Sequence, residues 1–135
     1  MARIKTVEDL IASQLSEELK DRVFAFCRAV GCPRHRDFCD DIRRSARAAP
    51  ANLSEGFYRL RPRDNAKFVR YALGSLGASK NHLRHALKEH HITQDEFNEM
   101  WRFAKRAIGA ATKYHQYLMS CPPAGPEPPP ETENP

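Results

Sequence analysis

Apolar residues recur at steps of three or four along four stretches of this sequence, and this spacing restricts the fold more than any other feature. The clearest stretch runs through Phe97, Trp101, Ala104, Ile108, Ala111, His115 and Leu118. Such a pattern places its members on one face of an α-helix and is typical of a bundle seam. Alternation typical of strands is scarce. The sequence therefore predicts an all-α protein, an antiparallel up-down four-helix bundle in a single domain over residues 1–120.

The start of the first predicted helix can be placed in two ways. Thr6 followed by Asp9 resembles a capping box, with Asp9 in place of the usual glutamate, and this helix would end near Gly31. Ser16 followed by Glu17 is a second plausible start. In that case the segment consists of a short helix and a longer one.

The fourth predicted helix has clear ends. Thr93 and Glu96 have the spacing of a capping box, and the apolar repeat stops near Ser120. The remaining residues, 121–135, contain seven of the ten prolines of the chain. A segment of this composition cannot build a core, so we expect a disordered or polyproline-like tail.

A proline interrupts the second predicted helix, which spans roughly residues 37–60. Pro50 lacks the amide hydrogen of a helical residue and crowds the preceding turn, which costs about 3 kcal/mol unless a kink absorbs it. The apolar period continues in phase beyond Pro50, so we expect one kinked helix; two shorter helices are the alternative. Asn52 and Glu55, one turn apart, are candidates to satisfy backbone groups that the proline frees.

The third predicted helix follows the break at residues 61–64 and runs to about His91, with Asp64 as a candidate cap. Gly74 and Gly77 lie in its interior and together cost about 2 kcal/mol of helix propensity. We therefore expect a neighbouring helix to approach closely at these glycines and offset the loss.

The charge of the chain is unevenly distributed. The formal net charge is +5, but the last fifteen residues carry three glutamates and no lysine or arginine, which leaves +8 on the remainder. A basic body indicates an anionic partner. No stretch approaches the roughly 20 apolar residues that cross a bilayer, and no secretory leader is recognisable. We therefore expect a cytoplasmic protein without a membrane partner.

Arginine and lysine cluster in the second and third predicted helices and at the junction between them. The candidate nucleic-acid-binding residues are Arg43, Arg44, Arg47, Arg59, Arg61, Arg63, Lys80, Arg84 and Lys88. Arginine matches phosphate geometry with a planar set of donors, and Tyr58 and Tyr71 lie among these charges, where they could stack on bases. The alternative is a solvated face that nearby acidic residues partly neutralise.

Neither a catalytic set nor a metal or cofactor site is evident. The histidines lack the spacing of a metal-binding pair on a helix, and His115 fits a core position from which it would donate to a neighbouring helix. The cysteines are too irregularly spaced for a zinc site, and Cys27 and Cys39 fit helical core positions. We therefore predict no enzyme and no cofactor.

Three motifs in order resemble the bacterial four-helix-bundle family named for the 23S rRNA intervening-sequence protein. They are IRRSA at residues 42–46, PANLSEG at 50–56 and ALGSL at 72–76. The motif residues that we assign a structural role are Pro50, Asn52, Glu55, Gly56 and Gly74. Family members usually carry glutamates shortly after the third motif, where this chain has Ala78 and Lys80. This difference makes the third helix more basic.

The resemblance implies an antiparallel bundle that assembles into a ring, as a homopentamer. It also relates the chain to the accessory variability proteins of diversity-generating retroelements, which bind nucleic acid and the reverse transcriptase of the element. Our first hypothesis is a non-enzymatic, oligomeric RNA- or DNA-binding protein that serves as an accessory to a reverse transcriptase. The second is an adaptor whose basic face binds an acidic protein and whose proline-rich tail is a bait or spacer. A metal-dependent enzyme that uses the histidines is third.

Overall fold

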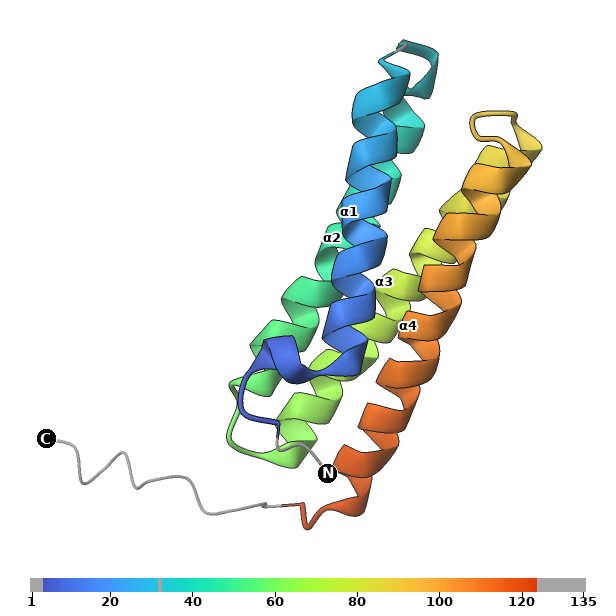
Figure 1. Ribbon diagram of the computed structural model, residues 1–135. Helices are drawn as coiled ribbons and strands as arrows, with labels where there is room; N and C mark the ends of the chain where they lie inside the picture. Colours follow the sequence, from blue (N-terminus) through green and yellow to red (C-terminus); the bar gives the residue numbers. More distant parts are fainter. Residues whose placement is uncertain (1–3, 32, 124–135) are drawn as a thin grey trace, which may run out of the picture.

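A computed structural model describes residues 4–31 and 33–123 of the chain. Its α-helices are α1 (Ile11–Val30), α2 (Arg36–Phe57), α3 (Pro62–Lys88) and α4 (Gln94–Ser120). Short 3-10 helices, η1 (Val7–Asp9) and η2 (Pro33–His35), precede α1 and α2. Consecutive helices run in opposite directions, and α1 with α2 lies beside α3 with α4 (Figure 1). The predicted all-α four-helix bundle is confirmed, and the described residues contain no strand.

Small and branched apolar side chains fill the space between the helices. Leu19, Ile42, Leu53, Leu76 and Leu83 are almost completely inaccessible to solvent. A fully buried leucine or isoleucine contributes about 1.5–3 kcal/mol relative to an exposed one. Fully buried alanines lie among them on three of the helices: Ala46, Ala49, Ala66, Ala72, Ala86, Ala104, Ala107 and Ala111. Because alanine ends at Cβ, these positions allow the helix axes to approach closely.

The first helical segment is divided, but not at the predicted alternative start. The Asp9 carboxylate accepts from the backbone N–H of Thr6 at 3.0 Å, and this turn is the 3-10 helix η1. Leu10 then has extended backbone, and α1 begins at Ile11 rather than at Thr6 or beside Ser16. The helix ends at Val30, and its C-cap residue Gly31 has a φ of +51°, in the left-handed region that favours glycine.

The predicted single helix across Pro50 is confirmed, since α2 is helical on both sides of the proline and ends at Phe57. The next helix starts earlier than expected because Pro62 occupies its first turn, where the missing amide hydrogen costs nothing. Arg61 is therefore the N-cap residue of α3. Asp64 lies inside the first turn and does not cap the helix, which corrects the prediction.

The helix α4 begins and ends as predicted. Thr93 Oγ1 accepts from the backbone N–H of Glu96 at 3.1 Å, and the Glu96 carboxylate accepts from the backbone N–H of Thr93 at 2.8 Å. The helix ends at Ser120. Most of the predicted disordered tail, residues 124–135, lies outside the described residues.

Close approach between helices occurs at a different glycine from the predicted pair. A Cβ atom on Gly56 of α2 would lie 2.8 Å from Asn65 Oδ1 and 2.8 Å from Phe68 Cβ of α3. A Cβ atom on Gly74 or Gly77 would meet nothing within 4 Å. The expectation that a helix of this chain covers those two glycines is therefore wrong. Their surface on α3 is open to solvent.

Candidate nucleic-acid interface

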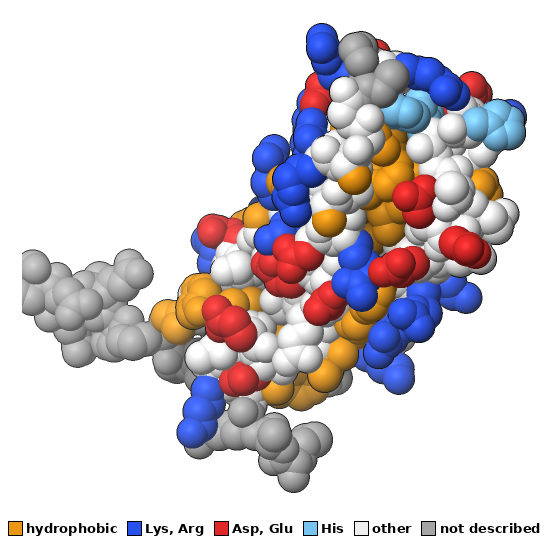
Figure 2. All heavy atoms as spheres, turned by 45° about the horizontal axis from the view of Figure 1, so that its top comes forward, with side chains coloured by type: hydrophobic (Ala, Val, Ile, Leu, Met, Phe, Trp, Pro, Cys, Tyr) orange, Lys and Arg blue, Asp and Glu red, His pale blue; other side chains and the backbone are white. Residues whose placement is uncertain are grey.

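The nine predicted nucleic-acid-binding residues lie on several faces of the bundle and do not form one patch. Arg43 and Arg47 line separate depressions between α1 and α2, whereas Arg44 lines a groove between α2 and α3. Arg59, Arg61 and Arg63 surround the connection from α2 to α3, and Lys80, Arg84 and Lys88 lie in the second half of α3. On the face drawn in Figure 2, lysine and arginine side chains form separate groups with acidic side chains between them.

Within the described residues, acidic side chains neutralise three of the four predicted arginines that α2 and its end supply, all except Arg47. Arg43 lies 2.8 Å from Asp40, Arg59 lies 2.6 Å from Glu55, and Arg44 is 3.7 Å from Asp41. The Arg59 guanidinium also lies 4.8 Å from the ring centre of Phe68. All of these pairs are at least one-third exposed, so each contributes about 1 kcal/mol or less to stability. Their main effect is to cancel local positive charge.

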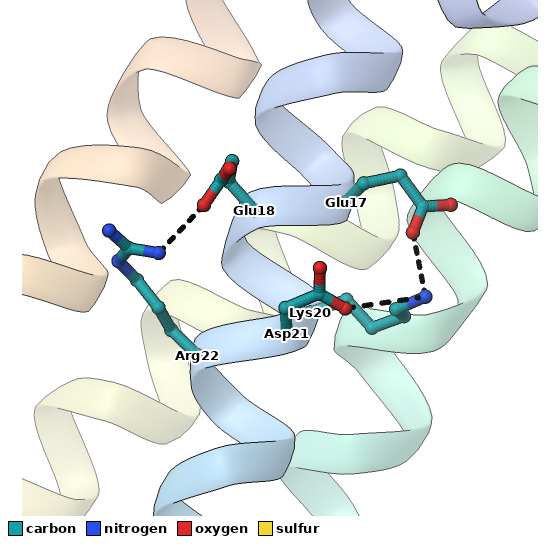
Figure 3. A network of polar contacts seen from close by, with 5 residues as sticks. All are labelled: Glu17, Glu18, Lys20, Asp21 and Arg22. Carbon is teal, nitrogen blue, oxygen red and sulfur yellow. Dashed lines mark hydrogen bonds and ion pairs between the residues drawn. The ribbon is translucent and has the colours of Figure 1, made fainter.

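Two of the three basic residues of α1 are neutralised in the same way. Lys20 lies 2.6 Å from Glu17 and 3.7 Å from Asp21, and Arg22 lies 2.7 Å from Glu18 (Figure 3). This surface of α1 is therefore close to electrically balanced.

The basic residues of α3 are different because none of them has a carboxylate partner among residues 4–31 and 33–123. They are Arg63, Lys67, Arg70, Lys80, Arg84 and Lys88. The only acidic residue of α3 is Asp64. It lies in the first turn, where a negative charge interacts favourably with the helix dipole and stabilises the helix. The helix α4 has no acidic residue after Glu99. The uncompensated positive charge of the bundle is therefore concentrated on α3 and the later turns of α4.

Lys80 and Arg84 lie over an aromatic side chain rather than beside acids. Lys80 Nζ is 4.4 Å and Arg84 Cζ 5.3 Å from the ring centre of Trp101 on α4. The Phe97 ring stacks near Trp101, with centres 5.0 Å apart and planes 25° apart. We call Lys80, Arg84, Phe97 and Trp101 the Trp101 platform. The sequence pattern assigned Trp101 only to the seam, and its partial exposure follows from its place at the edge of α4 that faces α3.

The motif residues around Pro50 act within α2 and on its contact with α3. Asn52 Nδ2 donates to the carbonyl oxygen of Ala48 at 2.9 Å. Pro50 instead frees the carbonyl of Ala46, four residues before it, so Asn52 does not satisfy that group as predicted. Glu55 does not bind backbone as suggested, because its carboxylate accepts from Arg59. Gly56 provides the close contact with α3 described above.

Gly74 lies in the groove between α2 and α3. This groove has a volume of about 690 Å³, with small residues such as Ala48, Ser75 and Ala78 along it and Arg44 and Tyr71 also lining it. The predicted stacking residue Tyr71 is therefore on this side of α3. Tyr58 lies at the far end of α2 with 65% of its surface exposed.

One histidine contact was not expected from the sequence. His35 Nδ1 lies 2.8 Å from His91 Nδ1 and so joins the α1–α2 connection to the α3–α4 connection. His115 Nε2 is 3.4 Å from Arg70 Nη1, so it accepts from α3 rather than donating to it, and its ring is only partly buried. Within the described part of the chain, no three His, Cys, Asp or Glu residues are placed to hold a metal ion.

The cysteine prediction is confirmed for the two helical positions. Cys27 and Cys39 are buried in the core between α1 and α2. Burial, the neighbouring Cys39 thiol and Asp40 raise the pKa of Cys27 to about 12 despite the opposing charge of Arg43. A thiol with this pKa is almost entirely protonated near neutral pH, which fits a packing role.

Among residues 4–31 and 33–123, no helix combines the length and the hydrophobicity that a membrane span requires.

Comparisons with known proteins identify the family. No curated protein matches the chain. A crystal structure of a protein of unknown function from Bacteroides thetaiotaomicron, from the S23 ribosomal protein family, has the same fold with a TM-score of 0.62. The two sequences are 17% identical, and the match covers 82% of this chain and 96% of the other. Residues 8–110, which include α1 to α3 and the first part of α4, match the sequence pattern described as 23S rRNA-intervening sequence protein. The chain therefore belongs to the 23S rRNA-intervening sequence protein family.

Proposed function

We propose that this protein is a non-enzymatic, oligomeric accessory protein that binds RNA or DNA through backbone phosphates. The observation that carries the proposal is the set of α3 cations without carboxylate partners in the described structure. A paired arginine must leave its carboxylate before it can bind a phosphate. An unpaired one can bind a phosphate directly, and the release of cations condensed on the nucleic acid then drives binding. The α3 cations are therefore the primary contacts, with Arg61 and Arg63 at one end.

Assembly into a ring would strengthen such a surface. A modest cationic patch repeated around an oligomer increases avidity without any new kind of contact. The number of five copies is carried over from the family resemblance. The open surface at Gly74 and Gly77 supports a contact between copies, because no helix of the same chain packs against these two glycines to offset their low helix propensity. The same resemblance supports a role beside a reverse transcriptase.

The salt dependence of binding tests the proposal. We would measure affinity for short RNA and DNA strands and duplexes over a salt series, for the wild type and for a variant with Lys80→Gln, Arg84→Gln and Lys88→Gln. Each lost phosphate contact should reduce the slope of log affinity against log salt by about 0.7–0.9.

A matched control is Arg43→Gln with Arg44→Gln and Arg59→Gln, which removes the same charge from arginines already paired with acids. This variant should change the slope less than the α3 variant. Equal slopes for the α3 variant and wild type would contradict the proposed surface. Absence of binding at low salt would contradict nucleic-acid binding altogether.

An adaptor is the second candidate, and a specific surface favours it. At the α2–α3 connection, Tyr58 and Leu60 are 65% and 57% exposed, and Tyr117 near the end of α4 is 63% exposed. Leu60 and Tyr117 line one depression together with Arg59. Exposed aromatic residues combined with arginine are enriched in protein interfaces. Removal of residues 121–135 that abolishes binding of an acidic protein partner, with nucleic-acid binding intact, would favour this function.

A further inference from the structure

We infer that the Trp101 platform stacks on an unpaired base, so that the preferred ligand is single-stranded nucleic acid. This inference rests on the proposed function and specifies its ligand. Trp101 is the only tryptophan of the chain, is partly exposed, and has Lys80 and Arg84 over its ring at 4.4 and 5.3 Å. Lys105 lies one helical turn further along α4 and is also exposed. An aromatic ring is thus combined with three cations at the edge between α3 and α4.

The two glutamates of α4 do not neutralise this edge. Glu96 accepts from the backbone N–H of Thr93 at the helix start. Glu99 lies 2.7 Å from Arg22 and so belongs to the surface that α4 shares with α1. No carboxylate within the described ranges pairs with Lys80, Arg84 or Lys105. A phosphate at this edge would therefore meet uncompensated positive charge.

Binding of nucleic acid can replace the contacts of Lys80 and Arg84 with the Trp101 ring by stronger contacts with phosphates. A cation over an exposed aromatic ring contributes about 0.5–1 kcal/mol. A hydrogen bond between that cation and a charged phosphate contributes about 1.5–3 kcal/mol. When Lys80 and Arg84 turn to phosphates, the ring face of Trp101 that they cover becomes available. A base stacked on an aromatic side chain then adds about 1–3 kcal/mol.

The preference for single-stranded over double-stranded nucleic acid follows from access to the base. In a duplex, both faces of an internal base are stacked on neighbouring base pairs, and the side chains of a protein reach only the edges and the backbone. A single strand can present a base face to an aromatic ring while its phosphates bind nearby cations. The Trp101 platform provides both elements side by side. Packing of Trp101 against Phe97 fixes the ring in place before the ligand arrives.

The single tryptophan allows a direct test. The full-length protein would be titrated at low salt with oligothymidine of about 12 nucleotides, within the known range of site sizes, and with a duplex of the same length. Fluorescence of Trp101 reports stacking, and anisotropy of a labelled strand reports affinity. We expect the single strand to quench Trp101, to protect it from iodide, and to bind more tightly than the duplex.

Substitutions separate stacking from charge. Trp101→Leu should reduce affinity for the single strand about tenfold, which is the middle of the range for one stacked base, and affinity for the duplex much less. Trp101→Phe should retain part of the binding. Tyr117→Leu, an exposed aromatic of the same helix, should leave single-strand affinity unchanged. Far-ultraviolet circular dichroism verifies that each variant is folded.

Two results would overturn the inference while leaving nucleic-acid binding in place. One is equal binding of strand and duplex without a change in Trp101 fluorescence. The other is unchanged single-strand affinity in folded Trp101→Leu. If that variant does not fold, the absence of iodide protection in the wild type has the same meaning. No binding of either ligand at low salt would instead contradict the proposed function itself.

Discussion

His35 and His91 lie with their Nδ1 atoms 2.8 Å apart, and this contact joins the α1–α2 connection to the α3–α4 connection. At this distance one Nδ1–H donates to the other nitrogen, so at least one ring must be neutral. The His91 ring also stacks parallel to Phe38 with centres 5.5 Å apart. Arg34 Nη2 donates to the Glu89 carbonyl oxygen at 3.2 Å across the same junction. Histidine side chains are visible together at this end of the molecule in Figure 2.

The first prediction concerns pH. Burial, followed by the charges of His35 and Arg34, lowers the pKa of His91 below 6.5, although Glu89 opposes this shift. The unfolded chain then binds more protons than the folded one, so the contribution of His91 to stability is complete above about pH 6.5. It is lost as the pH falls from there through the lower folded pKa. Urea unfolding between pH 7.5 and about 5 measures this dependence.

Replacement of His91 by glutamine should weaken that dependence, since the titrating group is gone. His85→Gln removes an exposed histidine of α3 and should leave the pH dependence as in the wild type. Parallel curves for wild type and His91→Gln would show that the histidine contact is not coupled to folding.

A second prediction distinguishes the glycines. In Gly56→Ala, the new methyl group would meet Asn65 Oδ1 and Phe68 Cβ at 2.8 Å, so α2 and α3 must separate. We expect a loss of about 1–3 kcal/mol in the free energy of unfolding. Gly109→Ala in α4 is the matched control: its methyl group meets nothing within 4 Å, and the better helix propensity of alanine should add about 0.5–1 kcal/mol. Denaturant unfolding of both variants measures the two changes in the free energy of unfolding. Equal changes would refute the close contact between Gly56 and α3.

A third prediction concerns a partly buried hydrogen bond between α3 and α4. Asn65 Nδ2 donates to the Tyr114 hydroxyl at 2.7 Å, and Asn65 Oδ1 is buried without a partner in the described structure. Tyr114→Phe removes the acceptor and leaves the whole amide unsatisfied. We expect a cost of about 1–3 kcal/mol. Tyr117→Phe removes a hydroxyl from a side chain that is 63% exposed and should change stability by less than about 0.5 kcal/mol.

The fourth prediction concerns thiol chemistry. Because the pKa of Cys27 is raised to about 12 and the side chain is buried, almost no thiolate is available at pH 8. In a Cys32→Ser background, an alkylating reagent should modify Cys121 at least tenfold faster than Cys27 in the folded protein. Mass spectrometry of peptides gives the two rates. Similar rates in the folded state would mean that the α1–α2 seam opens readily, and urea provides the reference for full exposure.

Local sequence patterns predicted much of the fold because they depend on neighbours along the chain. The Thr93–Glu96 capping box and the end of α4 at Ser120 need only residues within one turn. Pro62 shows the limit of the same reasoning. A proline reads equally well as a break or as the first residue of a helix, and only the path of the chain assigned it to the start of α3.

Side-chain pairing was not predictable in the same way. Lys80 and Trp101 are 21 positions apart, and His35 and His91 are separated by 56. Which residues meet depends on the rotation of each helix about its axis and on the register of the antiparallel pairs. The periodicity of one helix does not determine either quantity to within one residue, and a shift of one residue turns a side chain by about 100°.

The sequence by itself determined four amphipathic helices, their order and the excess of positive charge on the chain, because periodicity and composition are local properties. Tertiary packing decided which charges remain available. It placed Arg43, Arg44 and Arg59 beside carboxylates, left the cations of α3 without such partners, and put Trp101 under Lys80 and Arg84. It also assigned close packing to Gly56 rather than Gly74. The physical reason is that charge neutralisation and close contact depend on distances of a few ångströms between segments, which only the packed bundle defines.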